Sequence, residues 1–159
     1  MNIYKNFLNE KDFKQIESFM MSPNMPWFFN DGVVSWNDKK YFQFTFLFLD
    51  EGKKNCVDEH FNILKPFFKK IKFNKLNRIK ANLLTKDKKI IEHGMHTDQK
   101  QGITGIFYLN TCNGYTKFET GEKIKSEKNK YIEFNSTLKH TGSTCTDEKR
   151  RVVINFNYV

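Results

Sequence analysis

The feature that most constrains the fold is a succession of short apolar segments that fills the second half of the chain. From Leu76 onward, segments of strand character alternate with turn signals, over residues 78–85, 90–98, 102–110, 116–119, 130–134, 138–141 and 151–159. Several short strands separated by turns favour a closed or sandwiched β-architecture over βαβ units. We therefore predict a mainly β fold with flanking helices, with a jelly roll as the natural candidate because it supports inward-facing side chains from several strands.

The first half of the chain has a different pattern. Apolar residues at helical spacing predict a helix over 9–21 with Asn9 as its N-cap, and a second helix over 57–71 in which Pro66 favours a kink. A β-rich segment lies at 40–49, and residues 22–37 carry loop signals together with Trp27 and Trp36. We expect one domain over 1–159, with a helical and aromatic layer at 1–75 and a β-core at 76–159.

Composition narrows the setting in which the protein works. The formal charge of +9 would suit a nucleic-acid partner, but the lysines are scattered along the chain and form no block. The three cysteines, Cys56, Cys112 and Cys145, lack ligand spacing and suggest neither a disulfide framework nor a structural zinc site. With no apolar run that resembles a signal peptide or a membrane span, we expect a cytoplasmic protein without a membrane partner. The oligomeric state stays open.

Two histidines and one aspartate carry the chemistry. On a strand, His96 and Asp98 point to the same face while Thr97 points away. His140 on a neighbouring strand would complete two imidazoles and one carboxylate, the facial arrangement that leaves positions of an Fe(II) ion open for other ligands. The alternative is that these are ordinary surface or core histidines.

The order of these residues resembles a known family. The runs are His96-Thr97-Asp98, Gly102 to Asn110 with Tyr-Leu-Asn at its end, Asn113 to Phe118, His140-Thr141-Gly142 and Arg151 to Asn157. They are similar to the prolyl-4-hydroxylase-like branch of the Fe(II)/2-oxoglutarate dioxygenases, from Leu76 to the C-terminus. The resemblance implies a cupin-like double-stranded β-helix in which His96, Asp98 and His140 hold Fe(II).

The resemblance also implies a binding site for 2-oxoglutarate. Its far carboxylate needs a fixed cation, and an arginine offers a planar, two-pronged donor. Arg151 is placed for this role at the start of the last strand, with Asn155 as the inward residue four positions on. Arg150 is the alternative, because a slip of one residue turns the whole strand over.

Four further residues match cosubstrate positions of the family. Tyr108 matches the phenol that bonds the far carboxylate, Ile106 and Thr116 match pocket-lining positions, and Asn82 matches a residue that points toward cosubstrate or iron. Barrel core is the alternative for Ile106, Thr116 and Tyr108. His93 lies three residues before His96 and would face the other way on a strand.

The activity implied is hydroxylation of a C–H bond, with 2-oxoglutarate converted to succinate and carbon dioxide. The cofactors are Fe(II), 2-oxoglutarate and O2, with ascorbate as an auxiliary reductant. The substrate class is a prolyl or other residue in a peptide or protein, a free amino acid or a small metabolite. Trp27, Trp36 and the segment 86–91 are candidate substrate contacts, although a solvated turn is the simpler explanation of 86–91.

Two other functions remain open. One is a cupin-like module that binds a metal or a carboxylate without turnover; a barrel that only bound a metal would not need Arg151 with Tyr108. The other is a nucleic-acid-directed oxygenase. The demethylase branch ends in Arg-x-Asn-x-Thr-x-Arg, and the segment from Arg151 to Asn157 departs from that motif.

Overall fold

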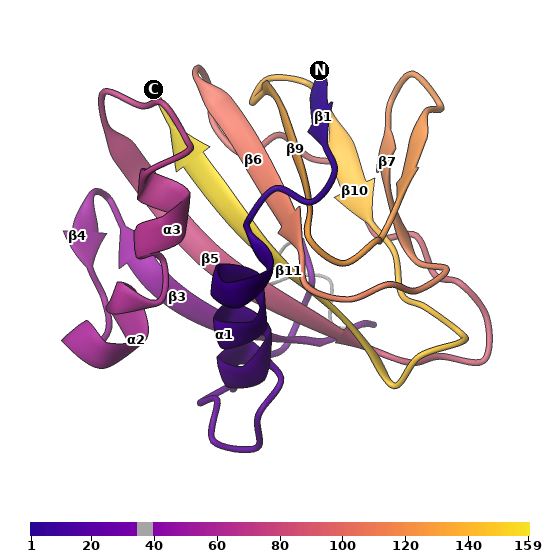
Figure 1. Cartoon of the computed structure of the whole chain (residues 1–159). Coiled ribbons are helices and arrows are strands. Elements are labelled where there is room, and N and C mark those ends of the chain that lie inside the picture. The colour runs from indigo at the N-terminus through magenta and orange to yellow at the C-terminus, as the bar shows by residue number, and fades with distance from the viewer. Residues whose placement is uncertain (35–39) are drawn as a thin grey trace.

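The fold is a β-sandwich with helices on its outer face (Figure 1), seen in a computed structural model that describes residues 1–34 and 40–159. The strands of the large sheet are β1 (Asn2–Tyr4), β2 (Phe28–Asn30), β3 (Gln43–Asp50), β4 (Lys53–Lys54), β5 (Leu76–Thr85), β6 (Ile103–Tyr108), β9 (Lys130–Asn135) and β11 (Arg150–Tyr158). The small sheet holds β7 (Tyr115–Phe118), β8 (Lys123–Lys125) and β10 (His140–Gly142). The predicted mainly β, jelly-roll fold is confirmed.

Strand order places the last strand near the centre of the large sheet. The order is β1-β9-β6-β11-β5-β3-β2, with β4 paired to β3, and the small sheet runs β10-β7-β8. The pairs are antiparallel, and β11 lies between β5 and β6, where Arg151 is paired with Leu84 and Asn155 with both Lys80 and Ile106. The side chains of Arg151 and Asn155 on β11 therefore lie on the same face of the sheet as those of Leu84 and Lys80 on β5.

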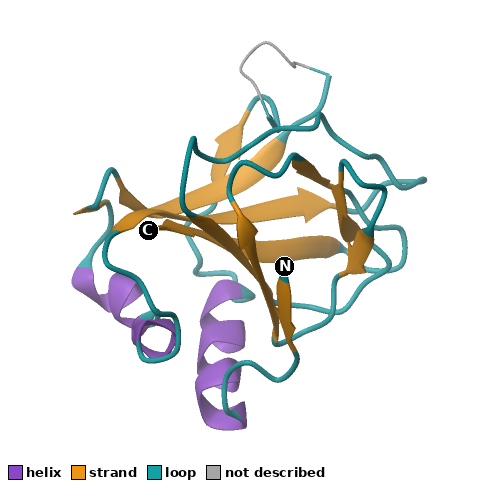
Figure 2. Ribbon diagram, turned by 90° about the horizontal axis from the view of Figure 1, so that it is seen from above, coloured by secondary structure: helices purple, strands orange, loops and turns teal. Residues whose placement is uncertain are grey.

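Three helices cover the face of the large sheet that turns away from the small sheet (Figure 2). They are α1 (Glu10–Met20), α2 (Asp58–Asn62) and α3 (Lys65–Phe68). As predicted, Asn9 caps α1, because its side chain accepts a hydrogen bond from the Asp12 amide at 2.9 Å. The continuous helix predicted over 57–71 is wrong. The chain turns between Asn62 and Lys65, and Pro66, which lacks an amide donor, lies in the first turn of α3.

The large sheet separates two apolar clusters. The larger one joins the helices to the outer face and includes Phe13, Phe48, Phe67, Phe107 and Phe156. The smaller one lies between the two sheets and includes Tyr108, Phe118, Ile132 and Val153. Among the described residues, no helix has the length and apolar character required to cross a membrane. The sandwich thus leaves one end of the space between the sheets for polar side chains.

One predicted strand forms only in part. Residues 90–98 are not a continuous strand, since pairing is limited to isolated bridges from Glu92 to Ser143 and from His96 to His140. Backbone hydrogen bonds of 3.0 and 2.9 Å join His96 and His140 in both directions. The segment that carries His96 is therefore anchored at the point where it meets β10.

Candidate active site

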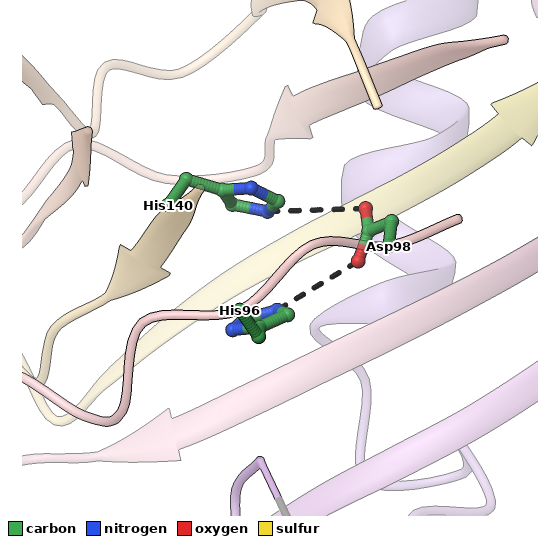
Figure 3. A group of neighbouring side chains, drawn as sticks. All are labelled: His96, Asp98 and His140. Carbon is green, nitrogen blue, oxygen red and sulfur yellow. Dashed lines mark ion pairs between the residues drawn. The ribbon is translucent and has the colours of Figure 1, made fainter. Parts of the chain in front are cut away.

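His96, Asp98 and His140 meet at one end of the sandwich (Figure 3). Their ligand atoms all lie within 4.8 Å of one another. Asp98 lies between the imidazoles: one carboxylate oxygen is 3.7 Å from Nε2 of His96 and the other is 3.8 Å from Nε2 of His140. The side chains of Asp98 and His140 are 2% and 3% exposed, whereas that of His96 is 32% exposed. This group has one side open to solvent.

Hydrogen bonds fix which imidazole nitrogen faces the group. Nδ1 of His140 lies 3.1 Å from the Leu138 carbonyl, and Nδ1 of His96 lies 3.2 Å from the Gly94 carbonyl. A carbonyl only accepts, so each Nδ1 carries the hydrogen and each Nε2 keeps its lone pair. Burial lowers the pKa of His140, and the nearby His96 lowers it further, against the opposing effect of Asp98. His140 is therefore held neutral, which is the form that binds a metal.

Asp98 is oriented by residues of two sheet strands. The hydroxyl of Thr104 and the amide of Asn157 each donate to the same carboxylate oxygen at 3.0 Å. The Arg78 guanidinium lies 3.6 Å from the other oxygen. Burial raises the pKa of Asp98, but His140, Asn157 and Arg78 together lower it below its ordinary value. Asp98 is thus an ionised and fixed oxygen donor.

The three residues line a cavity of about 250 Å³ between the sheets. The predicted residues Asn82, Ile106, Thr116, Arg151 and Asn155 line the same cavity. Tyr108 lies behind Thr116, is fully buried, and donates its hydroxyl to Thr116 Oγ1 at 2.9 Å. Burial is the main cause that raises the pKa of Tyr108, to about 12. The structure thus gathers the predicted residues from six segments around one space.

Arg151 and Arg150 point in opposite directions. Arg151 is 3% exposed and directs its side chain into the cavity, where Nη2 donates to Thr116 Oγ1 at 3.1 Å. Arg150 instead donates to the Met21 carbonyl at the end of α1, at 2.7 Å. Two glycines make room for Arg151: a Cβ at Gly114 would lie 2.7 Å from its Cδ, and one at Gly142 would lie 3.3 Å from Nη1.

Arg151 has no counter-charge in the part of the chain that the structure describes. No carboxylate pairs with it there, and its Nε has no hydrogen-bond partner among the described residues. Burial lowers the pKa of Arg151, yet an arginine stays protonated in proteins. A buried cation without a partner is costly, so this one points to an anion that the site is built to receive.

Some residues that line the cavity were not identified from the sequence. Arg78 and Lys80 lie on β5, four and two residues before Asn82, and all three side chains line the cavity. The period of two along the strand was the signal that could have found them. Asn157 likewise lies two residues beyond Asn155 and bonds Asp98. Arg78 and Lys80 therefore place more positive charge on the cavity wall than we predicted from the sequence.

The other residues considered from the sequence lie elsewhere in the fold or outside the described residues. Trp27 packs partly buried against the larger apolar cluster. Trp36 lies outside the described residues. The segment 86–91 is held to the β10–β11 loop, where the Lys86 amide donates to the Lys149 carbonyl and the Ile91 amide to Thr144, both at 2.9 Å. His93 is buried with its ring 5.4 Å from that of Tyr41, and it is not part of the group formed by His96, Asp98 and His140.

Solved structures share this architecture from end to end. An oxidoreductase of the 2OG-Fe(II) oxygenase family from Burkholderia pseudomallei matches with a TM-score of 0.70 at 14% identity, over 97% of this chain and 81% of the other. The chain has the fold of the 2OG-Fe(II) oxygenases. A Pseudomonas putida prolyl-4-hydroxylase matches with a TM-score of 0.61 at 11% identity, over 99% of this chain and 92% of the other.

Another match to this oxygenase fold was solved with a peptide. It is a Trichoplax adhaerens prolyl hydroxylase in complex with a peptide fragment of the hypoxia inducible factor oxygen degradation domain. Its TM-score is 0.70 at 13% identity, over 99% of this chain and 82% of the other. No family model and no curated protein matches the sequence.

Proposed function

We propose that this protein is an Fe(II)- and 2-oxoglutarate-dependent oxygenase that hydroxylates a C–H bond of an organic substrate. His96, Asp98 and His140 would hold the iron through two imidazole nitrogens and one carboxylate oxygen. The donor set fits the metal, because each Nε2 keeps its lone pair, Asp98 is ionised and the ligand atoms already converge. The second-layer bonds from Thr104 and Asn157 keep Asp98 in this orientation.

The observation that carries the proposal is the buried guanidinium of Arg151. It lies in the same cavity as the three grouped residues and has no counter-charge among the described residues. A dicarboxylic acid that reached from the metal to Arg151 would supply that charge. The Thr116 hydroxyl accepts from both Arg151 and Tyr108, so its own hydrogen is left to donate to the same carboxylate.

When bound, iron and 2-oxoglutarate supply the oxidation: O2 puts one oxygen atom into the substrate C–H bond and one into succinate, and carbon dioxide leaves. The chain contributes the rest. Its triad side chains hold the metal with open positions, and Arg151, Thr116 and Tyr108 orient the cosubstrate. Apolar Ile106 and Val153 line the same cavity and reduce the room for water. Asn82 and Asn155 would contact the cosubstrate from β5 and β11.

Two further cations, Arg78 and Lys80, line the cavity. Arg78 bonds Asn157 and faces Asp98, whereas the Lys80 ammonium makes no hydrogen bond or ion pair with any described residue. Burial and the neighbouring Arg78 lower the pKa of Lys80. We propose a substrate that brings an acidic group close to its reacting carbon. A residue of an acidic peptide is the leading class, with a free amino acid or small metabolic acid as the alternative.

The competing proposal is a module that binds metal or a carboxylate without turnover. A module that bound only a metal would account for the triad but would leave Arg151, Tyr108 and Thr116 without a role. The nucleic-acid-directed oxygenase is not favoured, since the cations that carry the proposal, Arg78, Lys80 and Arg151, line an interior cavity, whereas nucleic-acid binding calls for cations on an exposed face.

Anaerobic titration of Fe(II) and 2-oxoglutarate into the purified protein tests the proposal. We expect the weak visible charge-transfer band of a chelated keto acid. The band should be lost in Asp98→Ala, and in Arg151→Met it should need a much higher 2-oxoglutarate concentration. Arg150→Met is the matched control and should titrate as the wild type does. A folded wild-type protein without the band would contradict the oxygenase and favour the non-catalytic module.

A further inference from the structure

A second group of metal-ligating side chains lies near Arg151. Cys112 belongs to the loop between β6 and β7, and Cys145 and Asp147 belong to the loop between β10 and β11. The two sulfur atoms and a carboxylate oxygen all lie within 4.8 Å of one another. Cys145 is fully buried and Cys112 is 5% exposed, while Asp147 is exposed. The group is therefore reached from the surface through the carboxylate.

Hydrogen bonds join the two loops that carry this group. The Asn113 amide donates to both carboxylate oxygens of Asp147 at 3.0 Å. The Asn113 side chain donates to the Thr146 hydroxyl at 2.7 Å and accepts from the Thr146 amide at 2.9 Å. Asp147 is thus oriented by an outer partner, in the way that ligating carboxylates are oriented in metal sites.

The spacing of the group is close to that of a tetrahedral thiolate site. Zinc–sulfur bonds of about 2.3 Å place two sulfur ligands roughly 3.8 Å apart, so a closure of about 1 Å or less would form the site. Thiolate sulfur selects borderline-soft ions such as Zn²⁺ over Mg²⁺ or Ca²⁺. We propose that Cys112, Cys145 and Asp147 bind a divalent cation of the zinc class, with a water molecule as the fourth ligand.

Electrostatics fit a metal at this position. Both cysteines interact electrostatically with the buried Arg151 guanidinium. As a thiolate, each cysteine would favour the charged form of Arg151. Two thiolates and one carboxylate around a divalent ion carry one net negative charge, which would lower the cost of burying Arg151 while leaving its N–H groups in the cavity for an anion. Metal binding would release the two thiol protons.

A disulfide or a reactive thiol explains the group less well. Both cysteines are free thiols, and the Cys145 thiol donates to the Glu148 carbonyl at 3.3 Å. Neither role needs the oriented carboxylate of Asp147.

The proposed metal would brace the cosubstrate arginine. The loop of Cys112 continues into Gly114, whose missing side chain makes room for Arg151, and a Cβ there would also lie 2.7 Å from the Thr144 carbonyl in the other loop. An ion that joins the loops would hold this frame around Arg151. The role is structural, and it does not depend on whether the cavity performs oxygenase chemistry.

Anaerobic titration with Co²⁺ tests the site, because thiolate-to-cobalt charge transfer absorbs strongly in the near ultraviolet and His₂Asp coordination does not. We expect the band in the wild type and in Asp98→Ala, which disables only the His96 group. It should be lost in Cys112→Ser and Cys145→Ser and kept in Cys56→Ser, the matched control. Zn²⁺ should displace Co²⁺ and abolish it. A folded wild type without the band, or a band that survives both serine variants, would overturn the proposal.

Asp147→Asn provides a second test in case the variants of the buried cysteines fail to fold, because Asp147 is exposed and its replacement should not disturb the core. We expect the band to persist with cobalt affinity at least tenfold weaker, and Asp87→Asn to leave the affinity unchanged. In addition, Zn²⁺ should raise the Tm of Asp98→Ala, and at the same Zn²⁺ concentration it should raise that of Asp98→Ala combined with Asp147→Asn by less. Unchanged affinity in Asp147→Asn, or a Cys112–Cys145 disulfide in the protein as purified, would contradict the site.

Discussion

Arg151 and Thr116 join the two sheets of the sandwich through a buried hydrogen bond of 3.1 Å, at the inner end of the cavity. Thr116 is 1% exposed and also accepts the hydroxyl of Tyr108. A hydroxyl supplies only part of what a buried guanidinium needs, because it carries no charge. This incomplete pairing leads to the first two predictions.

Replacing Arg151 by methionine should separate stability from cosubstrate binding. We expect Arg151→Met to be about as stable as the wild type or up to a few kcal/mol more stable without ligands, because it removes an unpaired buried charge. With Mn²⁺ present, saturating 2-oxoglutarate at 100 times its Kd should stabilise the wild type by about 2.7 kcal/mol. The variant should show little of this shift in thermal unfolding. Arg150→Met should keep it; the opposite pattern would assign the anchor to Arg150.

Two buried threonines allow a crossed test of the site. Thr104 donates to the Asp98 carboxylate at 3.0 Å, whereas Thr116 contacts Arg151 and Tyr108. We expect Thr104→Val to weaken Mn²⁺ binding by about tenfold or more, the usual cost of losing an outer-shell bond. Thr116→Val should leave Mn²⁺ affinity nearly unchanged and weaken 2-oxoglutarate instead. Calorimetric titration of each ligand measures both effects, and equal losses in both variants would argue against two separate subsites.

Lys80 should cost the protein stability in the absence of substrate. Its ammonium is partly buried, and no described residue pairs with it. We expect Lys80→Met, which keeps the length of the side chain, to raise the free energy of unfolding by about 1 kcal/mol in denaturant. The exposed Lys75→Met should change it by less than about 0.5 kcal/mol. A destabilised Lys80→Met would mean that the ammonium already has a partner in the folded protein.

The sequence could predict the β-core because its strands alternate with turns, and β11 is the clearest case. The alternation of Arg151, Val153 and Asn155 on one face follows from the strand period alone. The segment before Asp98 could not be predicted in the same way. Its pairing is restricted to isolated bridges, which tertiary contacts to β10 impose and which leave no local pattern.

The remaining misses share a physical cause, which is that contacts between distant residues leave no mark on spacing. The three cysteines show no ligand spacing, yet the fold brings Cys112 to Cys145 and Asp147 through two loops that are far apart in the chain. Short edge strands such as β1 and β8 likewise depend on partners elsewhere. Arg78 and Lys80 were within reach, since they share a face with Asn82.

Glu92 provides the last prediction, on acid stability. Its carboxylate accepts from Lys117 and Tyr115 at 2.6 Å each and pairs with Lys123 at 3.0 Å. Hydrogen bonds from Lys117, then Tyr115, then Lys123 lower the pKa of Glu92 from 4.5 to about 2. A group whose pKa is lower in the folded state stabilises the fold above its unfolded pKa, and that contribution disappears as the pH falls toward 2.

Glu92→Gln should therefore be less stable than the wild type at neutral pH, by no more than about 1 kcal/mol because water screens these half-exposed groups. The difference should stay constant down to about pH 4.5 and should shrink steadily between pH 4.5 and 2. Urea unfolding at a series of pH values measures it, with Glu119→Gln as the control. A difference that stayed the same down to pH 2 would show that Glu92 acts through packing and not through its charge.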